Sequence, residues 1–179
     1  MTKNVKNLRI TRRFFLQVLS LTILLAIFLF PQKVSAQAKA NFGGTWAFNE
    51  TKSNLGESGA RRLAKQLTIK QEGNNLSVDR LRANQDGEES TVTSKYTLDG
   101  KECLNTMTMG DNSFTSKSNL TWSGDGKALT IATSVDRNGT ARKSSEVWKL
   151  TDAKTLSIAS TSTNREGAEV KATIVYDKK

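Results

Sequence analysis

The architecture of this chain can be read most directly in residues 127–150, KALTIATSVDRNGTARKSSEVWKL. Apolar and polar side chains alternate on both sides of Asn138-Gly139, which is the pattern of two half-buried strands. An Asn-Gly pair tolerates the positive φ angles that a tight hairpin turn requires. The stretch therefore predicts an antiparallel β-hairpin.

The same kind of unit recurs along the chain. The motif Lys127-Ala128-Leu129-Thr130-Ile131-Ala132 is matched 27 residues later by Lys154-Thr155-Leu156-Ser157-Ile158-Ala159. Turns rich in Gly, Asn and Asp recur throughout, and no proline follows Pro31, which suits long paired strands. We therefore predict an all-β domain, an up-and-down antiparallel β-barrel of about ten strands. The expected strands are 43–49, 64–72, 75–84, 89–98, 102–109, 114–122, 127–136, 140–150, 154–163 and 168–177.

The strand period of two separates an inward face from an outward face, and alternate turns of a meander lie at the same end. Inward positions near one end are apolar and predict a packed, closed end. Inward positions near the other end are often polar and predict a mouth. Leu81, which follows the inward Arg80, suggests a β-bulge there.

A barrel with one closed end and a polar mouth can hold one small ligand. An arginine in the mouth suits the anionic head group of an amphipathic ligand, and the apolar inward positions suit its tail. A filled barrel that acts through its surface, as an envelope interaction module or an inhibitor, stays open as the alternative. The predicted ligand contacts are Arg80, Ser94, Tyr96, Met107, Met109, Phe114, Ser116, Ser118, Thr133 and Arg142.

Phe42-Gly43-Gly44-Thr45-Trp46 opens the first expected strand, and its Gly-x-Trp resembles the lipocalin signature. That resemblance implies that Trp46 plugs the closed end of the barrel. Together with Asn49-Glu50-Thr51-Lys52-Ser53, the stretch is similar to a group of exported bacterial lipocalin-like proteins. Ten strands resemble the fatty-acid-binding branch of the calycins instead. The Arg-x-Tyr pair of that branch is missing before Tyr176, so its carboxylate site is not carried over.

Residues 1–36 have the zones of a cleavable secretion signal. A basic segment (1–13) precedes an almost wholly apolar one (14–30), and the small-residue site Val34-Ser35-Ala36 follows. We expect cleavage there and a single domain over 37–179, periplasmic or secreted. A retained membrane anchor is the alternative, because the apolar segment approaches the length that spans a bilayer.

Charge and residue types narrow the function classes. Six of the 27 basic residues and none of the 17 acidic ones lie in residues 1–36, so the net charge falls from +10 to +4 without that segment. Nucleic-acid binding therefore has little support. With no His and a single Cys103, expected to be buried, the usual general bases and metal ligands are lacking, and we expect neither an enzyme nor a cofactor or metal.

The acidic residues are of two kinds, those in turns and an inward one on a strand. Asp86, Glu88, Glu89 and Asp111 match no defined Ca²⁺ loop and are read as solvated turn residues. Glu146 is an inward carboxylate, and if buried it should pair with Arg80 or Arg142. We thus expect an exported monomer that binds a small hydrophobic or amphipathic ligand, with an envelope or membrane-surface partner as a further partner class.

Overall fold

The computed structural model describes residues 38–56, 63–83, 87–109, 112–137, 139–164 and 166–179. The chain divides into two units, Met1–Ala36 and Gln37–Lys179, and the second contains the fold discussed below. No helix among the described residues is long and apolar enough to cross a membrane. The strands are β1 (Gly44–Phe48), β2 (Gln66–Glu72), β3 (Asn75–Ala83), β4 (Glu89–Thr97), β5 (Cys103–Met109), β6 (Asn112–Trp122), β7 (Ala128–Arg137), β8 (Thr140–Asp152), β9 (Thr155–Thr163) and β10 (Glu169–Lys178).

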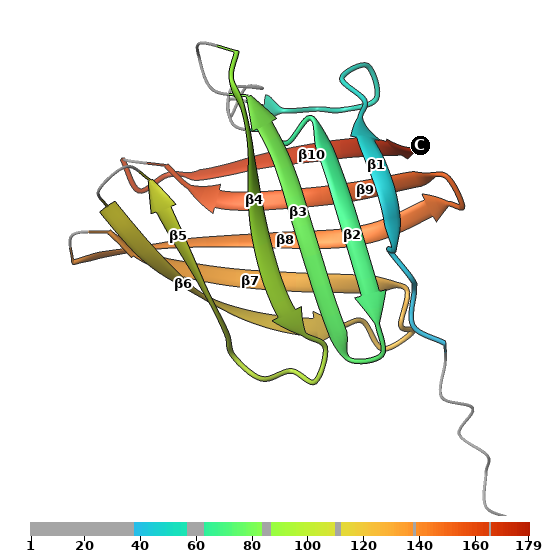
Figure 1. Ribbon diagram of the computed structural model, residues 1–179, viewed down its shortest axis with the longest axis horizontal. Coiled ribbons are helices and arrows are strands. Elements are labelled where there is room, and N and C mark those ends of the chain that lie inside the picture. Colours follow the sequence, from blue (N-terminus) through green and yellow to red (C-terminus); the bar gives the residue numbers. More distant parts are fainter. Residues whose placement is uncertain (1–37, 57–62, 84–86, 110–111, 138, 165) are drawn as a thin grey trace, which may run out of the picture. The chain divides into compact units, whose positions relative to one another are not determined.

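The ten strands form one antiparallel sheet in which nearly every strand pairs with its neighbours in sequence (Figure 1). The order runs β4-β3-β2-β1-β10-β9-β8-β7-β6-β5, and the β1–β10 pair joins the first half of the domain to the second. The predicted all-β fold with ten strands is thus confirmed. The order begins at β4 and ends at β5, so the barrel is nearly closed and these two edges meet at a seam.

Side chains bridge the seam between β4 and β5. The Asn105 side chain accepts a hydrogen bond from the Lys95 backbone N–H at 2.7 Å and donates one to the Lys95 carbonyl at 3.0 Å. The backbone N–H of Thr97 donates to Sγ of Cys103 at 3.2 Å. The Asn105 side chain therefore supplies the hydrogen bonds that the backbone of a neighbouring strand supplies elsewhere in the sheet. Cys103 is buried, as predicted, and its sulfur belongs to the wall.

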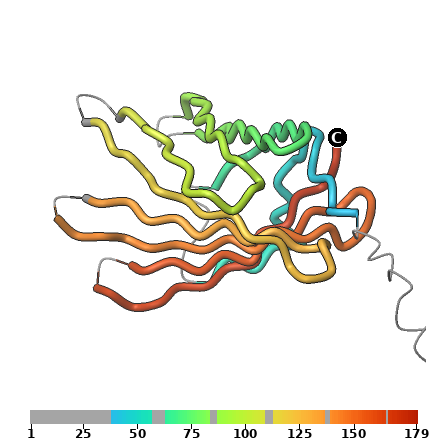
Figure 2. The backbone as a smooth tube through the Cα atoms, turned by 90° about the horizontal axis from the view of Figure 1, so that it is seen from below, coloured from blue at the N-terminus to red at the C-terminus, as the bar shows by residue number. Residues whose placement is uncertain are grey.

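The hairpin turns divide between two ends of the barrel, as the parity of the turns predicted (Figures 1 and 2). At the closed end three turns share the pattern Asp-x-Lys. In each turn the aspartate Oδ1 accepts the backbone N–H of the lysine two residues later, at 3.1 Å for Asp99, 3.1 Å for Asp125 and 2.7 Å for Asp152. A short polar side chain that bonds its own backbone in this way fixes a tight turn.

The closed end contains the hydrophobic core, which is plugged by two aromatic residues. Trp46 and Phe42 are fully buried, and the Trp46 indole N–H donates to the Phe42 carbonyl at 2.9 Å. Phe42 stacks on Trp122 with ring centroids 5.9 Å apart and meets Trp148 edge-on at 5.8 Å. The predicted place of Trp46 is therefore confirmed. The sequence analysis did not identify Phe42 as the residue that joins the three tryptophans.

The arm that carries Phe42 is fixed to the closed end by hydrogen bonds. Gln71 of β2 accepts the Phe42 backbone N–H at 3.0 Å and donates to the Ala40 carbonyl at 3.0 Å. The Ala40 N–H donates to the Gly126 carbonyl in the β6–β7 turn at 2.9 Å. These bonds position the aromatic plug from two sides of the barrel.

The expected β-bulge at Leu81 is wrong. The β2–β3 register passes through Arg80 and Leu81 without a shift, and the irregularity that does occur lies between β8 and β9 at Leu150 and Asp152. Arg80 stays inward because Glu146 pairs with it across the barrel. Leu81 faces outward and is half-buried, and its carbonyl accepts the Lys65 N–H at 2.8 Å.

Candidate functional site

An ion pair across the barrel interior separates the packed core from the mouth. Arg80 of β3 donates from Nη2 to Glu146 Oε2 of β8 at 3.2 Å, and from Nη1 to the Ser94 hydroxyl at 3.4 Å. Trp148 donates its indole N–H to the same Glu146 oxygen at 2.9 Å. The Arg80 guanidinium also lies 5.9 Å from the centroid of the Trp148 ring. The predicted pairing of Glu146 is confirmed, with Arg80 as the partner.

The electrostatics of this layer favour a charged arginine and a neutral tyrosine. Burial works against the charge of Arg80, but Glu146 and Tyr96 outweigh it, so the pKa of Arg80 is raised. Burial, and then the negative charge of Glu146, raise the pKa of Tyr176 to about 12. The Tyr176 hydroxyl donates to the Ala64 carbonyl at 3.2 Å. The floor of the mouth is therefore a compensated pair rather than an isolated charge.

Beyond this layer the inward side chains are mostly half-buried, whereas most of those at the closed end are buried; Trp122 and Leu150 are half-buried there. Glu146 points inward and still exposes 31% of its side chain, so solvent reaches it from inside the barrel. Packed cores leave few voids large enough for water. The interior of the mouth half is therefore less completely filled than the packed core, and we refer to this part, bounded by the Arg80–Glu146 layer, as the hollow. The other half-buried inward residues include Ser94, Asn105, Met107, Phe114, Ser116, Thr133, Val135, Arg142, Ser144, Ser160, Ser162, Val170 and Ala172.

Four of the predicted ligand contacts are engaged in the wall itself. Ser118 is 1% exposed, and its hydroxyl shares a hydrogen bond of 2.9 Å with the Thr133 hydroxyl. Ser116 donates to the Asn105 carbonyl at 3.0 Å. Ser94 accepts from Arg80 in the floor layer. Of these four residues, Ser94, Ser116 and Thr133 are half-buried, whereas Ser118 is buried.

The apolar part of the predicted site lies on β5 and β6. Met107 pairs with Phe114 in the β5–β6 register, and both are half-buried and inward. Met109 belongs to β5, but its side chain lies outside the described residues. Tyr96 is 8% exposed and belongs to the core rather than to the open part of the mouth.

Arg142 completes the predicted set. It faces inward on β8, opposite Val135 of β7, and is half-buried. Within the described parts of the chain, the structure gives its guanidinium no ion pair and no hydrogen bond. Arg142 is thus the arginine of the predicted site whose charge has no partner there, unlike Arg80.

Two contacts that shape the site were not predicted from the sequence. Glu146 was predicted as a partner of an arginine but not as an acceptor for Trp148. The bond between Asn105 and Lys95 across the seam was not foreseen. Alternation gives the side of a strand on which a residue lies; it does not give which strands form an open edge.

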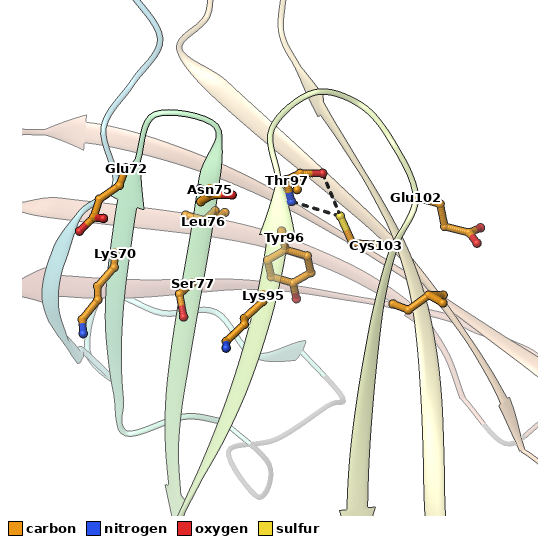
Figure 3. Close-up of a pocket in the computed structure, with 11 residues that line it drawn as sticks. Lys70, Glu72, Asn75, Leu76, Ser77, Lys95, Tyr96, Thr97, Glu102 and Cys103 are labelled. Atoms are coloured by element: carbon orange, nitrogen blue, oxygen red, sulfur yellow. Dashed lines mark hydrogen bonds between the residues drawn. The ribbon is translucent and has the colours of Figure 1, made fainter.

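Two grooves lie on the outer face of the sheet. One, of about 460 Å³, crosses β2, β3 and β4 to reach β5 and is bordered by Lys70, Lys95 and Leu104. Figure 3 shows its residues around the seam, with Thr97 and Cys103 joined by hydrogen bonds. The other, of about 430 Å³, crosses β6 to β10. Tyr96 borders the first groove and Thr133 the second; the other predicted ligand contacts line neither.

Metal binding has no support in the described part of the domain. No group of three or more His, Cys, Asp or Glu side chains is placed there to hold an ion. Of the acidic turn residues, Glu89 lies 3.5 Å from Lys65 in an exposed ion pair. Asp86 and Asp111 lie outside the described residues.

Comparison with known proteins identifies the fold. No protein-family model and no curated protein matches this sequence. Two crystal structures of substituted variants of the fluorescent protein UnaG are similar to this chain. The first is 18% identical with a TM-score of 0.50, covering 77% of this chain and 96% of that chain. The second is 18% identical with a TM-score of 0.45, covering 76% and 95%. The first likeness shows the fold alone, an antiparallel β-barrel of this architecture.

Proposed function

We propose that this protein is an exported binding protein that holds a small amphipathic molecule in the mouth of its barrel. The observation that carries the proposal is the exposure of inward side chains down to Glu146, which argues against a filled interior. Small-molecule sites are concave, mostly apolar and furnished with a few polar groups. Met107, Phe114 and Val135 supply the apolar wall, and the floor layer supplies the polar groups.

The contacts favour Arg142 over Arg80 for an anionic group of the ligand. The charge of Arg80 is already compensated by Glu146 at 3.2 Å, whereas Arg142 is half-buried with no partner in the described residues. A charge-assisted hydrogen bond contributes about 1.5–3 kcal/mol, which corresponds to about 10- to 100-fold in affinity. Arg142→Gln should therefore weaken binding of a fluorescent fatty acid by that factor and leave binding of its neutral methyl ester unchanged. Equal losses for both ligands would contradict an ionic contact at Arg142.

Blocking the mouth tests the site itself. Ser144 shares the inward parity of Glu146, two residues later on β8, and its neighbour Ser145 has the opposite, outward parity. Ser144→Phe should abolish fatty-acid binding because the ring would fill the hollow, whereas Ser145→Phe should leave binding intact. Fluorescence titration measures both, and thermal melts check that each variant is folded. Binding that survives Ser144→Phe would place the ligand elsewhere.

The outer surface supports the alternative function. Leu104 is 63% exposed and borders the groove at the seam, which is unusual for a large apolar side chain on a strand. If the titrations show no binding of any amphiphile at tens of micromolar, the protein is better described as an interaction module that acts through this surface.

A further inference from the structure

The Glu146 carboxylate has one oxygen that is bonded within the protein and one that is not. Both hydrogen bonds that the structure gives to this carboxylate, from Arg80 and from Trp148, end at Oε2. In the described part of the barrel, Oε1 receives none. The Glu146 side chain is 31% exposed, against 12% for Arg80, so the glutamate is the member of the pair that faces the hollow.

We propose that Glu146 Oε1 is the hydrogen-bond acceptor that recognises the inner end of the ligand, so that this end carries a neutral donor, a hydroxyl or an N–H group. This inference rests on the proposed function and specifies the chemistry of the same site. A carboxylate oxygen accepts hydrogen bonds only, and a donor that leaves water to enter the hollow loses affinity unless it finds such an acceptor.

The charges around Glu146 exclude the two ionic alternatives for the inner end. An anionic head at this depth would meet the glutamate oxygen and be repelled. An ammonium group would gain little, because Arg80 already compensates the negative charge at 3.2 Å. A neutral donor avoids both costs and needs no further charge.

Arg142 determines which end of the ligand carries the anionic group. Arg142 lies on the same inward face of β8, four residues from Glu146 toward the Gly139 turn. Four residues of strand span ~13 Å. The ligand class is therefore an elongated molecule with an anionic group at its outer end, a hydroxyl or N–H group at its inner end, and an apolar body against Met107 and Phe114.

The test uses two fatty acids of equal chain length, one ending in a hydroxyl and the other in a methoxy group. Both have the carboxylate, the chain and a terminal oxygen, but only the hydroxyl is a donor. The intact mature domain should bind the hydroxy acid about 10-fold more tightly, the factor expected for one hydrogen bond to a charged group. Displacement of a fluorescent fatty acid measures both affinities.

Glu146→Gln sharpens the test, because the single carbonyl oxygen of glutamine must turn toward Arg80 and Trp148. The amide NH₂ then takes the place of Oε1, and the acceptor becomes a donor. The preference should fall to unity or reverse in favour of the methoxy acid. Glu169→Gln, an equivalent change on the outer side of β10 where Glu169 pairs with Lys171 at 2.9 Å, should keep the wild-type preference.

The outcomes separate the two proposals. If neither acid displaces the probe, the proposed binding function fails. If both bind equally well to the wild type, the acceptor role of Glu146 is overturned while the binding function stands. If Glu146→Gln folds and keeps the wild-type preference, the acceptor role is also overturned. Should that variant not fold, the preference of the wild type alone decides the question.

Discussion

Trp46 and Phe42 show how single residues close one end of the barrel. Both are fully buried, and the hydrogen bond from the Trp46 indole to the Phe42 carbonyl ties the first strand to the arm before it. Gly44, in the same motif, adopts φ 138°, and a Cβ atom there would lie 2.9 Å from Cε of Lys178. The Gly-x-Trp pattern is thus a backbone requirement as well as an aromatic one.

Trp46→Ala should lower the free energy of unfolding by about 3–5 kcal/mol, because it removes a buried ring that the surroundings cannot replace. Trp46→Phe is the matched control: it keeps an aromatic ring but loses the 2.9 Å bond to Phe42, and should cost clearly less. Chemical denaturation followed by circular dichroism measures both. A loss below about 1 kcal/mol for the alanine variant would show that this residue does not seal the barrel.

The floor of the mouth shows what residue patterns can and cannot predict. Alternation placed Arg80 and Glu146 on the same inward face, and a buried carboxylate needs a cation, so their pairing could be foreseen. The choice between Arg80 and Arg142 could not, because it depends on how far β3 and β8 are displaced along the barrel. For the proposed function, this pairing leaves Arg142 rather than Arg80 as the candidate to meet an anionic group.

At the level of the elements, the seam between β4 and β5 is the weakest part of the wall. Asn105 replaces two backbone hydrogen bonds with two from its side chain, at 2.7 and 3.0 Å. Asn105→Leu should cost about 1–3 kcal/mol of stability, the sum of two net hydrogen bonds, and should speed hydrogen exchange of the Lys95 amide. Asn119→Leu, on the exposed outer side of β6, should do neither. Unchanged exchange at Lys95 in Asn105→Leu would mean that other contacts hold the seam.

The strands themselves were predictable, and the seam was not. Strand limits match the prediction to within about two residues because the turn residues Asn, Asp and Gly mark the ends clearly. For β2 and β3, alternation also assigned the inward face correctly, since no register shift occurs between them. The position of the seam could not be predicted in the same way, because in a meander any two strands that are neighbours in sequence can form the unpaired edges. In the structure, side-chain hydrogen bonds identify it, between Lys95 and Asn105 and between Thr97 and Cys103.

For the whole molecule, the net charge is unevenly divided between residues 1–36 and the barrel domain. The six basic residues before Gln37 account for more than half of the net charge of +10, so the domain that forms the barrel is only weakly basic. A weakly charged barrel with a hollow floored by Arg80 and Glu146 suits a neutral or singly charged amphiphile rather than a polyanion. If residues 1–36 are removed, as we propose, the net charge falls from +10 to +4.

We predict that the exported protein begins at Gln37. Signal peptidase requires small residues at the cleavage position and two before it, here Ala36 and Val34, and tolerates variety between them. Ala36→Phe should therefore block processing, whereas Ser35→Phe, the matched control, should leave it intact. Intact-mass spectrometry of protein recovered from the envelope and the medium distinguishes the two forms. A full-length chain retained in the membrane fraction for the wild type would show that residues 1–36 are an anchor, and the barrel would then act at the membrane surface.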